Sequence, residues 1–471
     1  MESKEAKYRG HVVVLPYPSQ GHINPLVQFA KRLASKGVKA TVATTHYTVN
    51  SIHAPNVGVE PISDGFNESG HAQAPSTELY LESFKSVGSK TLSEVIQKYE
   101  NSAFPVNCVV YDSFFGWALD VARKHGIYGA PFFTYSAYVC SIYGHIRSGV
   151  LNLPIKNENK PVLLDGLPPL EFSDFPSYLR SPEFEVSIPY ATMNLNQFSN
   201  LEKVDWIFCN TLDELNGKEA ENGKPVSETW PAKSIGPMIP STYLDGRIED
   251  DKGYGANLWN PVGEECMMWL DSKPHASVVY VAFGSMLALS SAQMDEIGWG
   301  LKNSGWNFLW VVKKSESSKL SSAVVEGIQE KGLVVTWCNQ LEVLAHTSVG
   351  CFLTHCGWNS TLEGLSLGVP MVGVGKWADQ PTNAKFIQDV WRVGVRTKSD
   401  EKGIVSREEL ERCVKEVMEG KRSEEIKRNV KKWSEIAKEA ISEGGSSDKN
   451  IDEFVGHLCR GPAGQKGCSF L

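Results

Sequence analysis

The chain has 471 residues, of which 41% are hydrophobic, with a formal net charge of −8 and an isoelectric point near 5.8. A chain of this length exceeds one ordinary hydrophobic core, so we expect two domains. The acidic balance, without a long basic run, argues against a nucleic-acid binder.

Cysteine usage and hydropathy point to the cytoplasm. Ten cysteines are scattered singly, mostly in apolar segments, which is typical of reduced thiols rather than a disulfide framework, and no Cys/His spacing predicts a metal site. The apolar run His11–Leu15 is too short for a signal sequence or a membrane span, so we expect no stable membrane insertion. The last four residues fit a prenylation box at Cys468, but no polybasic stretch precedes them. We therefore expect a frayed tail and a monomeric protein.

The first element pattern is a strand, a helix and a second strand. Residues 11–15 form a buried strand, residues 16–22 a turn, residues 25–35 a helix and residues 38–43 the next strand. Asn24 reads as the N-cap of this helix, with proline at the first helical position. This is one βαβ unit of a parallel sheet.

Two polar residues are expected at the carboxyl edge of that sheet. His22 lies just before the predicted helix start, where the positive end of the helix dipole disfavours an imidazolium, so a neutral imidazole can accept a proton. Asp112 ends the predicted strand 106–111 and so reaches the same edge, where ligands bind in such folds. Either residue alone is commonly a capping or loop residue. Together they predict a general base and the carboxylate that orients it.

The second half repeats the pattern. A strand over 277–283 runs into Gly284 and Ser285, then a helix over 292–303 and a strand over 307–312. Three amphipathic helices are expected near the end of the chain, over 407–419, 423–441 and 449–459. We therefore predict an N-terminal domain over 1–236, a Pro- and Gly-rich linker over 237–261, a C-terminal domain over 262–445 and a final helix with its tail over 446–471.

Residues 337–380 carry the clearest site pattern. The apolar run 350–354 predicts a buried strand with His355 at its carboxyl end, followed by a turn and a helix that reaches Leu367. The free N–H groups and dipole at the start of that helix favour a phosphate, and the Gly357 backbone can approach an anion closely.

Acidic and amide side chains in the same block suit sugar hydroxyls. Glu363 lies about one helical turn after Ser360, so its carboxylate can return to the same crevice and accept two ribose hydroxyls. Asp379 and Gln380 follow the next predicted strand, over 369–374, and reach the same sheet edge. Each of these residues is commonplace alone, as a helix charge or an N-cap. Their conjunction at strand ends predicts a nucleotide-sugar site.

The whole block resembles the signature box of the plant secondary-metabolite UDP-glycosyltransferases of family 1. It reads WCNQLEVLAHTSVGCFLTHCGWNSTLEGLSLGVPMVGVGKWADQ and matches without gaps over 44 residues, 337 to 380. Asn339 departs from the proline that many members carry. The resemblance implies the α/β fold called GT-B, in which two doubly wound Rossmann-like domains face each other across a cleft, with the last helix crossing back to the N-terminal domain.

The resemblance also implies roles for the site residues, with UDP-glucose as donor substrate and no bound cofactor or metal. A terminal Gln in the box is associated with glucose in this family. The implied donor contacts are Trp337 and Cys338 with uracil, Gln340 and Glu363 with ribose, Ser285, His355, Gly357, Asn359 and Ser360 with diphosphate, and Trp358, Asp379 and Gln380 with the sugar.

The implied reaction is an inverting, metal-independent transfer of glucose to a hydroxyl or carboxyl group, which gives a β-glucoside. His22 and Asp112 match the catalytic dyad of the family. No Asp-x-Asp motif is present, so helix N–H groups are expected to bind the diphosphate where a cation would otherwise do so.

The acceptor is predicted to be a small lipophilic metabolite. The chain resembles the subgroup that acts on carboxylic acids, thiohydroximates, phenolics and steroid-like or terpenoid aglycones, and we favour a steroid or terpenoid hydroxyl. The Pro-rich stretch 153–182 is expected to fold over the acceptor side. An apolar pocket is expected from Phe114, Phe115, Tyr138, Phe184, Met193, Phe198 and Trp377.

Two other classes of protein share parts of this pattern. A nicotinamide oxidoreductase also uses paired α/β halves, but no G-x-G-x-x-G opens either first helix, and no P-loop signature supports an NTPase. A non-catalytic sugar-nucleotide sensor would keep the box and lack the dyad, so the presence of both His22 and Asp112 argues against it.

Overall fold

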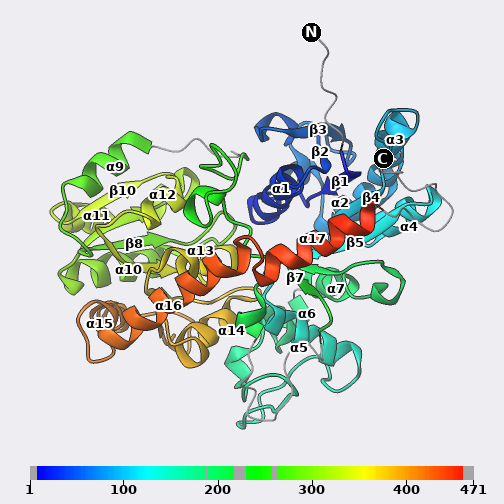
Figure 1. Ribbon diagram of the computed structural model, residues 1–471. Coiled ribbons are helices and arrows are strands. Elements are labelled where there is room, and N and C mark those ends of the chain that lie inside the picture. The colour runs from blue at the N-terminus through cyan, green and yellow to red at the C-terminus, as the bar shows by residue number, and fades with distance from the viewer. Residues whose placement is uncertain (1–7, 187, 217–229, 257–262, 460–471) are drawn as a thin grey trace.

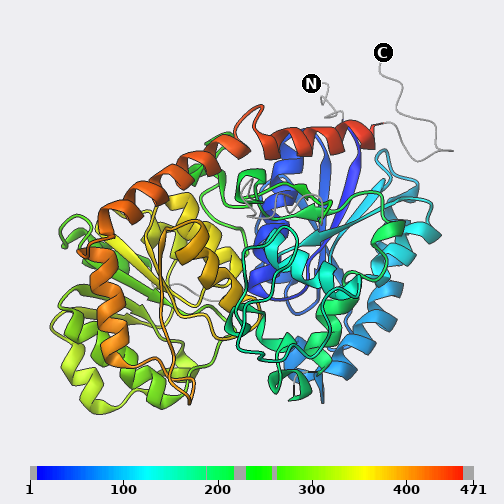
Figure 2. The same ribbon diagram turned by 90° about the horizontal axis from the view of Figure 1, so that it is seen from below.

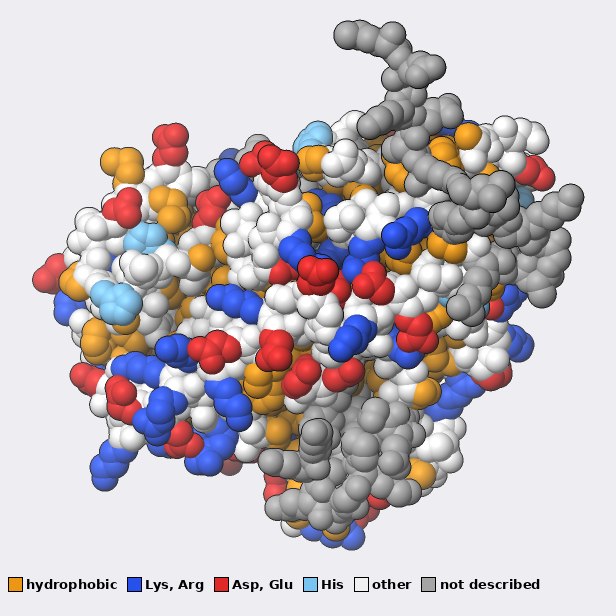
Figure 3. Space-filling model, viewed as in Figure 1, with side chains coloured by type: hydrophobic (Ala, Val, Ile, Leu, Met, Phe, Trp, Pro, Cys, Tyr) orange, Lys and Arg blue, Asp and Glu red, His pale blue; other side chains and the backbone are white. Residues whose placement is uncertain are grey.

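The computed structural model describes residues 8–186, 188–216, 230–256 and 263–459. They form two α/β lobes, each built on a parallel sheet (Figure 1). Both predicted sheets are therefore confirmed. The prenylation box at Cys468 and the end of the predicted linker, 257–261, lie outside the described residues. On the face drawn in Figure 3, acidic and basic side chains are interspersed.

The N-terminal sheet has seven parallel strands in the order β3-β2-β1-β4-β5-β6-β7. The direction of winding reverses between β1 and β4, so a crevice opens at their carboxyl ends. His22 comes soon after β1, and Asp112 is the last residue of β4. The strands are β1 (His11–Leu15), β2 (Lys39–Thr45), β3 (Val57–Ile62), β4 (Cys108–Asp112), β5 (Tyr128–Phe133), β6 (Phe208–Cys209) and β7 (Lys233–Ser234).

The C-terminal sheet repeats this arrangement with six parallel strands in the order β10-β9-β8-β11-β12-β13. Its winding reverses between β8 and β11, which places Ser285 and His355 beside the second crevice. The strands are β8 (Val278–Ala282), β9 (Asn307–Val311), β10 (Gly332–Val335), β11 (Val349–Thr354), β12 (Met371–Gly373) and β13 (Gly394–Arg396).

Helices cover both faces of each sheet, as the two views show (Figures 1 and 2). In the N-terminal lobe they are α1 (Gln20–Ser35), α2 (Thr77–Ser83), α3 (Ser89–Glu100), α4 (Trp117–Lys124), α5 (Ala137–Arg147), α6 (Glu183–Val186) and α7 (Ile188–Asn196). The rest of the chain adds α9 (Gly263–Asp271), α10 (Ser291–Ser304), α11 (Ser322–Ile328), α12 (Gln340–Leu344), α13 (Trp358–Leu367), α14 (Gln380–Lys385), α15 (Arg407–Met418), α16 (Ser423–Ile441) and α17 (Ser446–Leu458).

The start of α1 differs from the prediction. The helix begins at Gln20, after the extended residue Ser19, so Asn24 is not its N-cap and Pro25 lies inside it. Proline has no N–H to donate to the carbonyl four residues earlier, which is that of Gly21. The side-chain amide of Asn359, from the other lobe, donates to this carbonyl at 2.7 Å. A tertiary contact thus replaces the missing helical bond, and His22 belongs to the first turn of the helix.

The predicted linker, described over residues 237–256 and called the connector below, is anchored along α1. Asp251 accepts hydrogen bonds from Lys31 at 2.8 Å and from Gln28 at 2.5 Å, and Asp245 pairs with Arg32 at 2.8 Å. All these side chains are buried. The described part of the connector is therefore fixed to the N-terminal lobe. The exact domain boundaries stay predictions.

Two further segments join the lobes. The stretch predicted to fold over the acceptor side reaches the C-terminal lobe, where Thr382 donates to the carbonyl of Asp174 at 2.6 Å and the Asp174 carboxylate contacts Arg396 and Lys385. At the end of the chain, α17 crosses back to the N-terminal lobe and packs Phe454 into the core beside β1 (Figure 2).

Candidate active site

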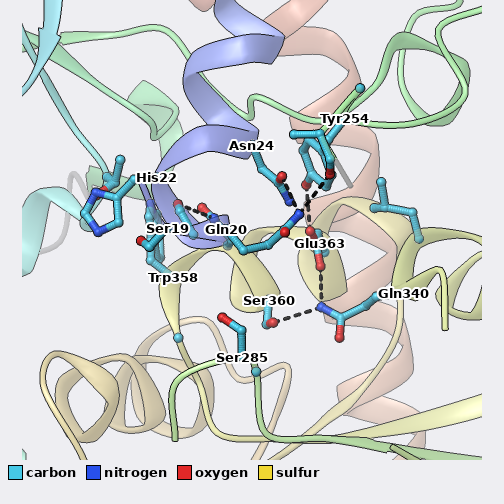
Figure 4. A pocket seen from close by; sticks show the side chains of 18 of the residues that line it. Ser19, Gln20, His22, Asn24, Tyr254, Ser285, Gln340, Trp358, Ser360 and Glu363 are labelled. Atoms are coloured by element: carbon cyan, nitrogen blue, oxygen red, sulfur yellow. Dashed lines mark hydrogen bonds between the residues drawn. The ribbon is translucent and has the colours of Figure 1, made fainter. Parts of the chain in front are cut away.

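A cavity of about 960 Å³ lies between the lobes and is lined by both. The N-terminal lobe contributes the start of α1 and the segments after β4 and β5, and the connector contributes Tyr254. The C-terminal lobe contributes the segments after β8, β11 and β12 together with the start of α13. Figure 4 shows His22 and Ser360 reaching this space from different lobes. The two sheet crevices thus merge into one site.

His22 and Asp112 form a close pair on the N-terminal side. The imidazole Nδ1 lies 2.6 Å from Asp112 Oδ2, and Asp112 is fully buried whereas the His22 side chain is 15% exposed. A carboxylate can only accept, so it fixes the proton on Nδ1 and leaves Nε2 as the basic nitrogen. This pair can act as a general base with an orienting carboxylate.

The surroundings hold the pair in place. The backbone N–H of Phe114 donates to Asp112 Oδ1 at 3.1 Å, which occupies the second carboxylate oxygen. The rings of Tyr17 and Phe114 lie with their centroids 5.3 and 5.0 Å from that of His22. The hydroxyl of Thr134 is 3.3 Å from His22 Nδ1. The imidazole is therefore oriented before any ligand arrives.

On the opposite side, His355 lies between two glycines. A Cβ on Gly284 or Gly357 would come within 2.7 or 2.5 Å of His355 Nε2, so a larger residue at either position would displace the imidazole. Burial, and to a lesser extent the nearby charge of Lys313, lowers the pKa of His355 to about 4. Its Nδ1 is buried and has no partner in the part of the chain that the structure describes. His355 is therefore a neutral group beside the N-terminus of α13.

A chain of hydrogen bonds organises the carboxylate of Glu363. Gln340 Nε2 donates to Glu363 Oε2 at 2.5 Å and to Ser360 Oγ at 2.9 Å, while the Tyr254 hydroxyl donates to Glu363 Oε1 at 2.6 Å (Figure 4). Burial raises the pKa of Glu363, and the bonds from Tyr254 and Gln340 act in the opposite direction. Both carboxylate oxygens are thus oriented at the cavity wall, where they can accept further hydroxyl groups.

The indole of Trp358, predicted to face the sugar, has a partner in the other lobe. Its indole N–H donates to the carbonyl of Asn210 in the N-terminal lobe at 2.6 Å, and only 4% of the residue is exposed. The residue borders the cavity, its indole N–H joins the lobes, and its contact with the sugar stays a prediction. The side-chain amide of Asn359, a residue predicted to contact the diphosphate, likewise donates to the carbonyl of Gly21 in the other lobe. Two residues of the box therefore link the lobes.

Asp379 and Gln380 lie at the start of α14. Burial raises the pKa of Asp379 to about 6, although a hydrogen bond from Asn383 at 2.7 Å acts against this shift. The Gln380 side-chain oxygen accepts from the backbone N–H groups of Lys376 and Trp377 at 3.3 and 3.1 Å. Both side chains are buried and line the cavity. Ser285, Trp337 and Cys338 also line it. Their contacts with a nucleotide sugar stay predictions.

The acceptor wall agrees with the prediction at only three positions. Phe114, Met193 and Trp377 line the cavity. Phe115 packs on Phe84 at 4.5 Å. The expectation is wrong for four side chains, which do not line the cavity. Phe115, Tyr138 and Phe198 are buried in the core, and the half-buried Phe184 packs on the cluster of Tyr178, Ala191 and Ala378.

Several wall residues were missed by the sequence analysis. The ring centroid of Trp377 lies 5.4 Å from that of Tyr178 and 6.3 Å from that of Tyr190, so aromatic rings from both lobes meet at this end of the cavity. Tyr135 follows the end of β5, and the rule that ligands bind at strand ends could have found it. Tyr254 lies in the connector between Gly253 and Gly255, and nothing in the local sequence predicts its contact with Glu363.

Within the described residues, no cluster of three or more His, Cys, Asp or Glu side chains is placed to hold a metal ion. The same residues include no helix that is both long and apolar enough to span a bilayer. All nine described cysteines are free thiols, and none of them forms a disulfide.

Comparison with known proteins agrees with this geometry. The family model described as UDP-glucoronosyl and UDP-glucosyl transferase matches residues 235–443. UDP-glycosyltransferase 74B1 of Arabidopsis thaliana is 50% identical over 467 residues, covering 97% of this chain and all of that protein. A flavonol 7-O-beta-glucosyltransferase of the same plant is 46% identical over 96% of this chain and 99% of its own length.

A solved structure matches over both lobes. The crystal structure of Os79 from O. sativa in complex with UDP superposes with a TM-score of 0.88 at 41% identity, covering 95% of this chain and all of that one. Another crystal of Os79 contains a trichothecene. The fold is therefore GT-B, and the chain belongs to the plant family 1 UDP-glycosyltransferases, enzymes that transfer sugar from a UDP-sugar donor to small plant metabolites.

Proposed function

We propose that this enzyme transfers glucose from UDP-glucose, with inversion, to a hydroxyl group of a small lipophilic plant metabolite. The observation that carries the proposal is the His22–Asp112 pair at 2.6 Å, which shares one cavity with Glu363, Gln340 and the start of α13. A general base and a nucleotide-binding crevice on opposite walls suit an in-line displacement between them.

The donor pose follows from the chemistry of the lining residues. The oriented Glu363 carboxylate suits the two ribose hydroxyls, and the N-terminus of α13 with Ser360 suits the diphosphate. Asp379 and Gln380 face the same cavity and suit glucose hydroxyls. By family resemblance, Trp337 stacks on uracil. Trp358 is left out of this pose because its indole N–H is used by Asn210.

In the proposed reaction, His22 Nε2 removes the proton of the acceptor hydroxyl. The oxygen forms a bond to the anomeric carbon from the face opposite UDP, while the bond to the diphosphate oxygen breaks and UDP leaves toward α13. Asp112 stabilises the imidazolium as it forms. The product is a β-glucoside, and His22 returns its proton to solvent.

The aromatic wall favours a lipophilic acceptor. Tyr17, Phe114, Tyr190, Met193 and Trp377 offer a largely apolar surface next to His22. We propose a steroid or terpenoid hydroxyl as the acceptor, in line with the trichothecene bound by Os79. A phenolic acceptor is the second candidate because a close relative is named a flavonol 7-O-beta-glucosyltransferase. A carboxylic acid or thiohydroximate is the third.

The test is a substitution of the base. His22→Ala should abolish UDP release with hydroxyl acceptors and leave UDP affinity within about twofold, because the base acts on the acceptor alone. The matched control is His46→Ala, an exposed histidine just after β2 at the same sheet edge and outside the cavity. Retained turnover in His22→Ala would refute the mechanism. An α-linked product, identified from the anomeric proton coupling in NMR spectra, would refute inversion.

We propose further that the enzyme acts as a monomer in the cytoplasm. The support is that eight of the nine described cysteines are buried free thiols, as expected in a reducing compartment. Light scattering coupled to gel filtration tests the monomer, and a dimer mass at micromolar concentration would contradict it.

A further inference from the structure

A half-buried lysine supports the loop that follows β8. Lys313 comes just after β9, and its ammonium donates to the backbone carbonyls of Ser285 at 3.1 Å and Leu287 at 2.8 Å. Both of these loop residues line the large cavity. Lys313 itself lines a small cavity of about 50 Å³ that adjoins the large one and shares Trp337 and Gln340 with it. The lysine thus lies directly behind the loop that faces the donor.

The charge of Lys313 has no carboxylate partner. Among the residues that the structure describes, no Asp or Glu oxygen lies within 4 Å of its ammonium. Glu316, the acidic residue nearest in sequence, pairs with Lys319 at 2.7 Å. The charge reaches the cavity, because together with burial it lowers the pKa of His355. Burial lowers the pKa of Lys313 itself, and the more distant charge of Glu316 acts in the opposite direction.

Other cations are poorly placed to serve the donor side. Among the described residues, the lysines that line the cavity are Lys31 and Lys252, and no described arginine lines it. Lys31 is paired with Asp251 at 2.8 Å, and both lysines belong to the N-terminal lobe or its connector. The diphosphate, which gains charge as the sugar leaves, must therefore be stabilised by dipoles and by cations behind the wall.

We propose that Lys313 is a positioning residue for the donor diphosphate: it holds the loop at Ser285 and Leu287 in place, and its charge, which forms no ion pair, favours the diphosphate across that loop. The inference rests on the proposed function, since it requires that the crevice between β8 and β11 receives the diphosphate. Lys313 touches neither the reacting atoms nor the sugar, so it acts through Ser285 and His355.

The test compares a charged and an uncharged ligand of the same crevice. Dissociation constants of UDP and of uridine, measured by competition against UDP-glucose, are compared for the wild-type enzyme, Lys313→Met and Lys313→Arg. UDP affinity should fall at least about tenfold in Lys313→Met, equivalent to about 1.4 kcal/mol, while uridine affinity changes less than about twofold. Lys313→Arg keeps the charge and should restore most of the loss.

The matched control is Lys319→Met. Lys319 donates to the carbonyl of Leu289 at 2.8 Å, so it also ties down the segment after β8, but Glu316 neutralises it. Its removal should leave the ratio of UDP to uridine affinity unchanged. Added salt provides a second measurement, because UDP affinity of the wild-type enzyme should fall more steeply with ionic strength than that of Lys313→Met.

The outcomes separate the two proposals. Equal losses for UDP and uridine in Lys313→Met would show a purely structural role and overturn the inference, and so would unchanged UDP affinity or an equal shift in Lys319→Met. If the wild-type enzyme bound uridine as tightly as UDP, the diphosphate would not occupy this crevice, and the proposed function would fall first.

Discussion

Replacing Asp112 by asparagine isolates the contribution of the buried carboxylate, because it replaces one carboxylate oxygen with an NH₂ group and leaves the shape of the side chain intact. In the wild-type protein Asp112 Oδ2 accepts from His22 Nδ1 at 2.6 Å, and Oδ1 accepts from the Phe114 N–H at 3.1 Å. An asparagine keeps its oxygen on the Phe114 N–H and turns its NH₂ toward Nδ1. The imidazole then carries its proton on Nε2, where it cannot accept one from the acceptor.

The magnitude follows from two losses. A hydrogen bond to a charged group contributes about 1.5–3 kcal/mol, and loss of this contribution to the developing imidazolium slows the reaction roughly 10- to 100-fold. The unfavourable tautomer adds a further loss, and the equivalent Asp-to-Asn change in a serine-protease triad lowers kcat about 10⁴-fold. The hydroxyl of Thr134, 3.3 Å from Nδ1, is neutral and cannot replace the carboxylate. We expect kcat to fall by about 10² to 10⁴.

The assay measures UDP release with a hydroxyl acceptor, together with UDP affinity and the melting temperature. Asp120→Asn, an exposed change on α4, serves as the control. UDP affinity should stay within about twofold, since His22 lies on the acceptor side. A carboxylic acid acceptor is already ionised and should lose less than a hydroxyl acceptor. If Asp112→Asn kept more than about a tenth of wild-type kcat with a hydroxyl acceptor, the orienting role would be wrong.

Three further substitutions test other parts of the structure. Tyr254→Phe removes a hydrogen bond that stabilises ionised Glu363, whose pKa burial already raises. As the pH falls from 8 to 5, UDP affinity of this variant should therefore start to weaken at a higher pH than that of the wild-type enzyme. UDP titrations across this range check the prediction, and identical pH dependence in the two proteins would contradict it. Asp174→Asn removes the buried carboxylate that pairs with Lys385 and Arg396 of the C-terminal lobe, and it should lower the free energy of unfolding by about 3 kcal/mol. Urea denaturation measures this change, and an unchanged midpoint would argue against the interlobe contact. Gly357→Ala places a Cβ 2.5 Å from His355 Nε2 and should weaken UDP binding at least about tenfold, with wild-type affinity as the contrary result.

The sequence predicts the site where chemistry coincides with strand ends. His22, Asp112 and His355 could be placed because apolar runs mark buried parallel strands, and the carboxyl ends of such strands share one edge. Ser360 and Glu363 follow from helical spacing. These inferences need only local periodicity and the geometry of a doubly wound sheet, which the structure confirms.

Side-chain directions set by tertiary contacts could not be predicted in this way. The Asn24-Pro25 pair has the local signature of a helix start, but the Asn359 amide satisfies the Gly21 carbonyl and lets α1 begin at Gln20. Phe114 and Phe115 are adjacent and equally apolar, yet one lines the cavity and the other packs in the core. The packing partners, which come from distant parts of the chain, decide between these faces.

Two residues of the proposed donor site also form contacts between the lobes. Trp358 and Asn359 lie in the box that resembles a nucleotide-sugar site, yet their side chains bond to Asn210 and Gly21 of the other lobe. Gly21 directly precedes His22, so one hydrogen bond connects the start of α13 with the first turn of α1. Tyr254 makes the reverse connection, because it belongs to a connector anchored on α1 and bonds to Glu363. The contacts that join the lobes therefore also connect the proposed donor wall at α13 with the first turn of α1, which carries the proposed base.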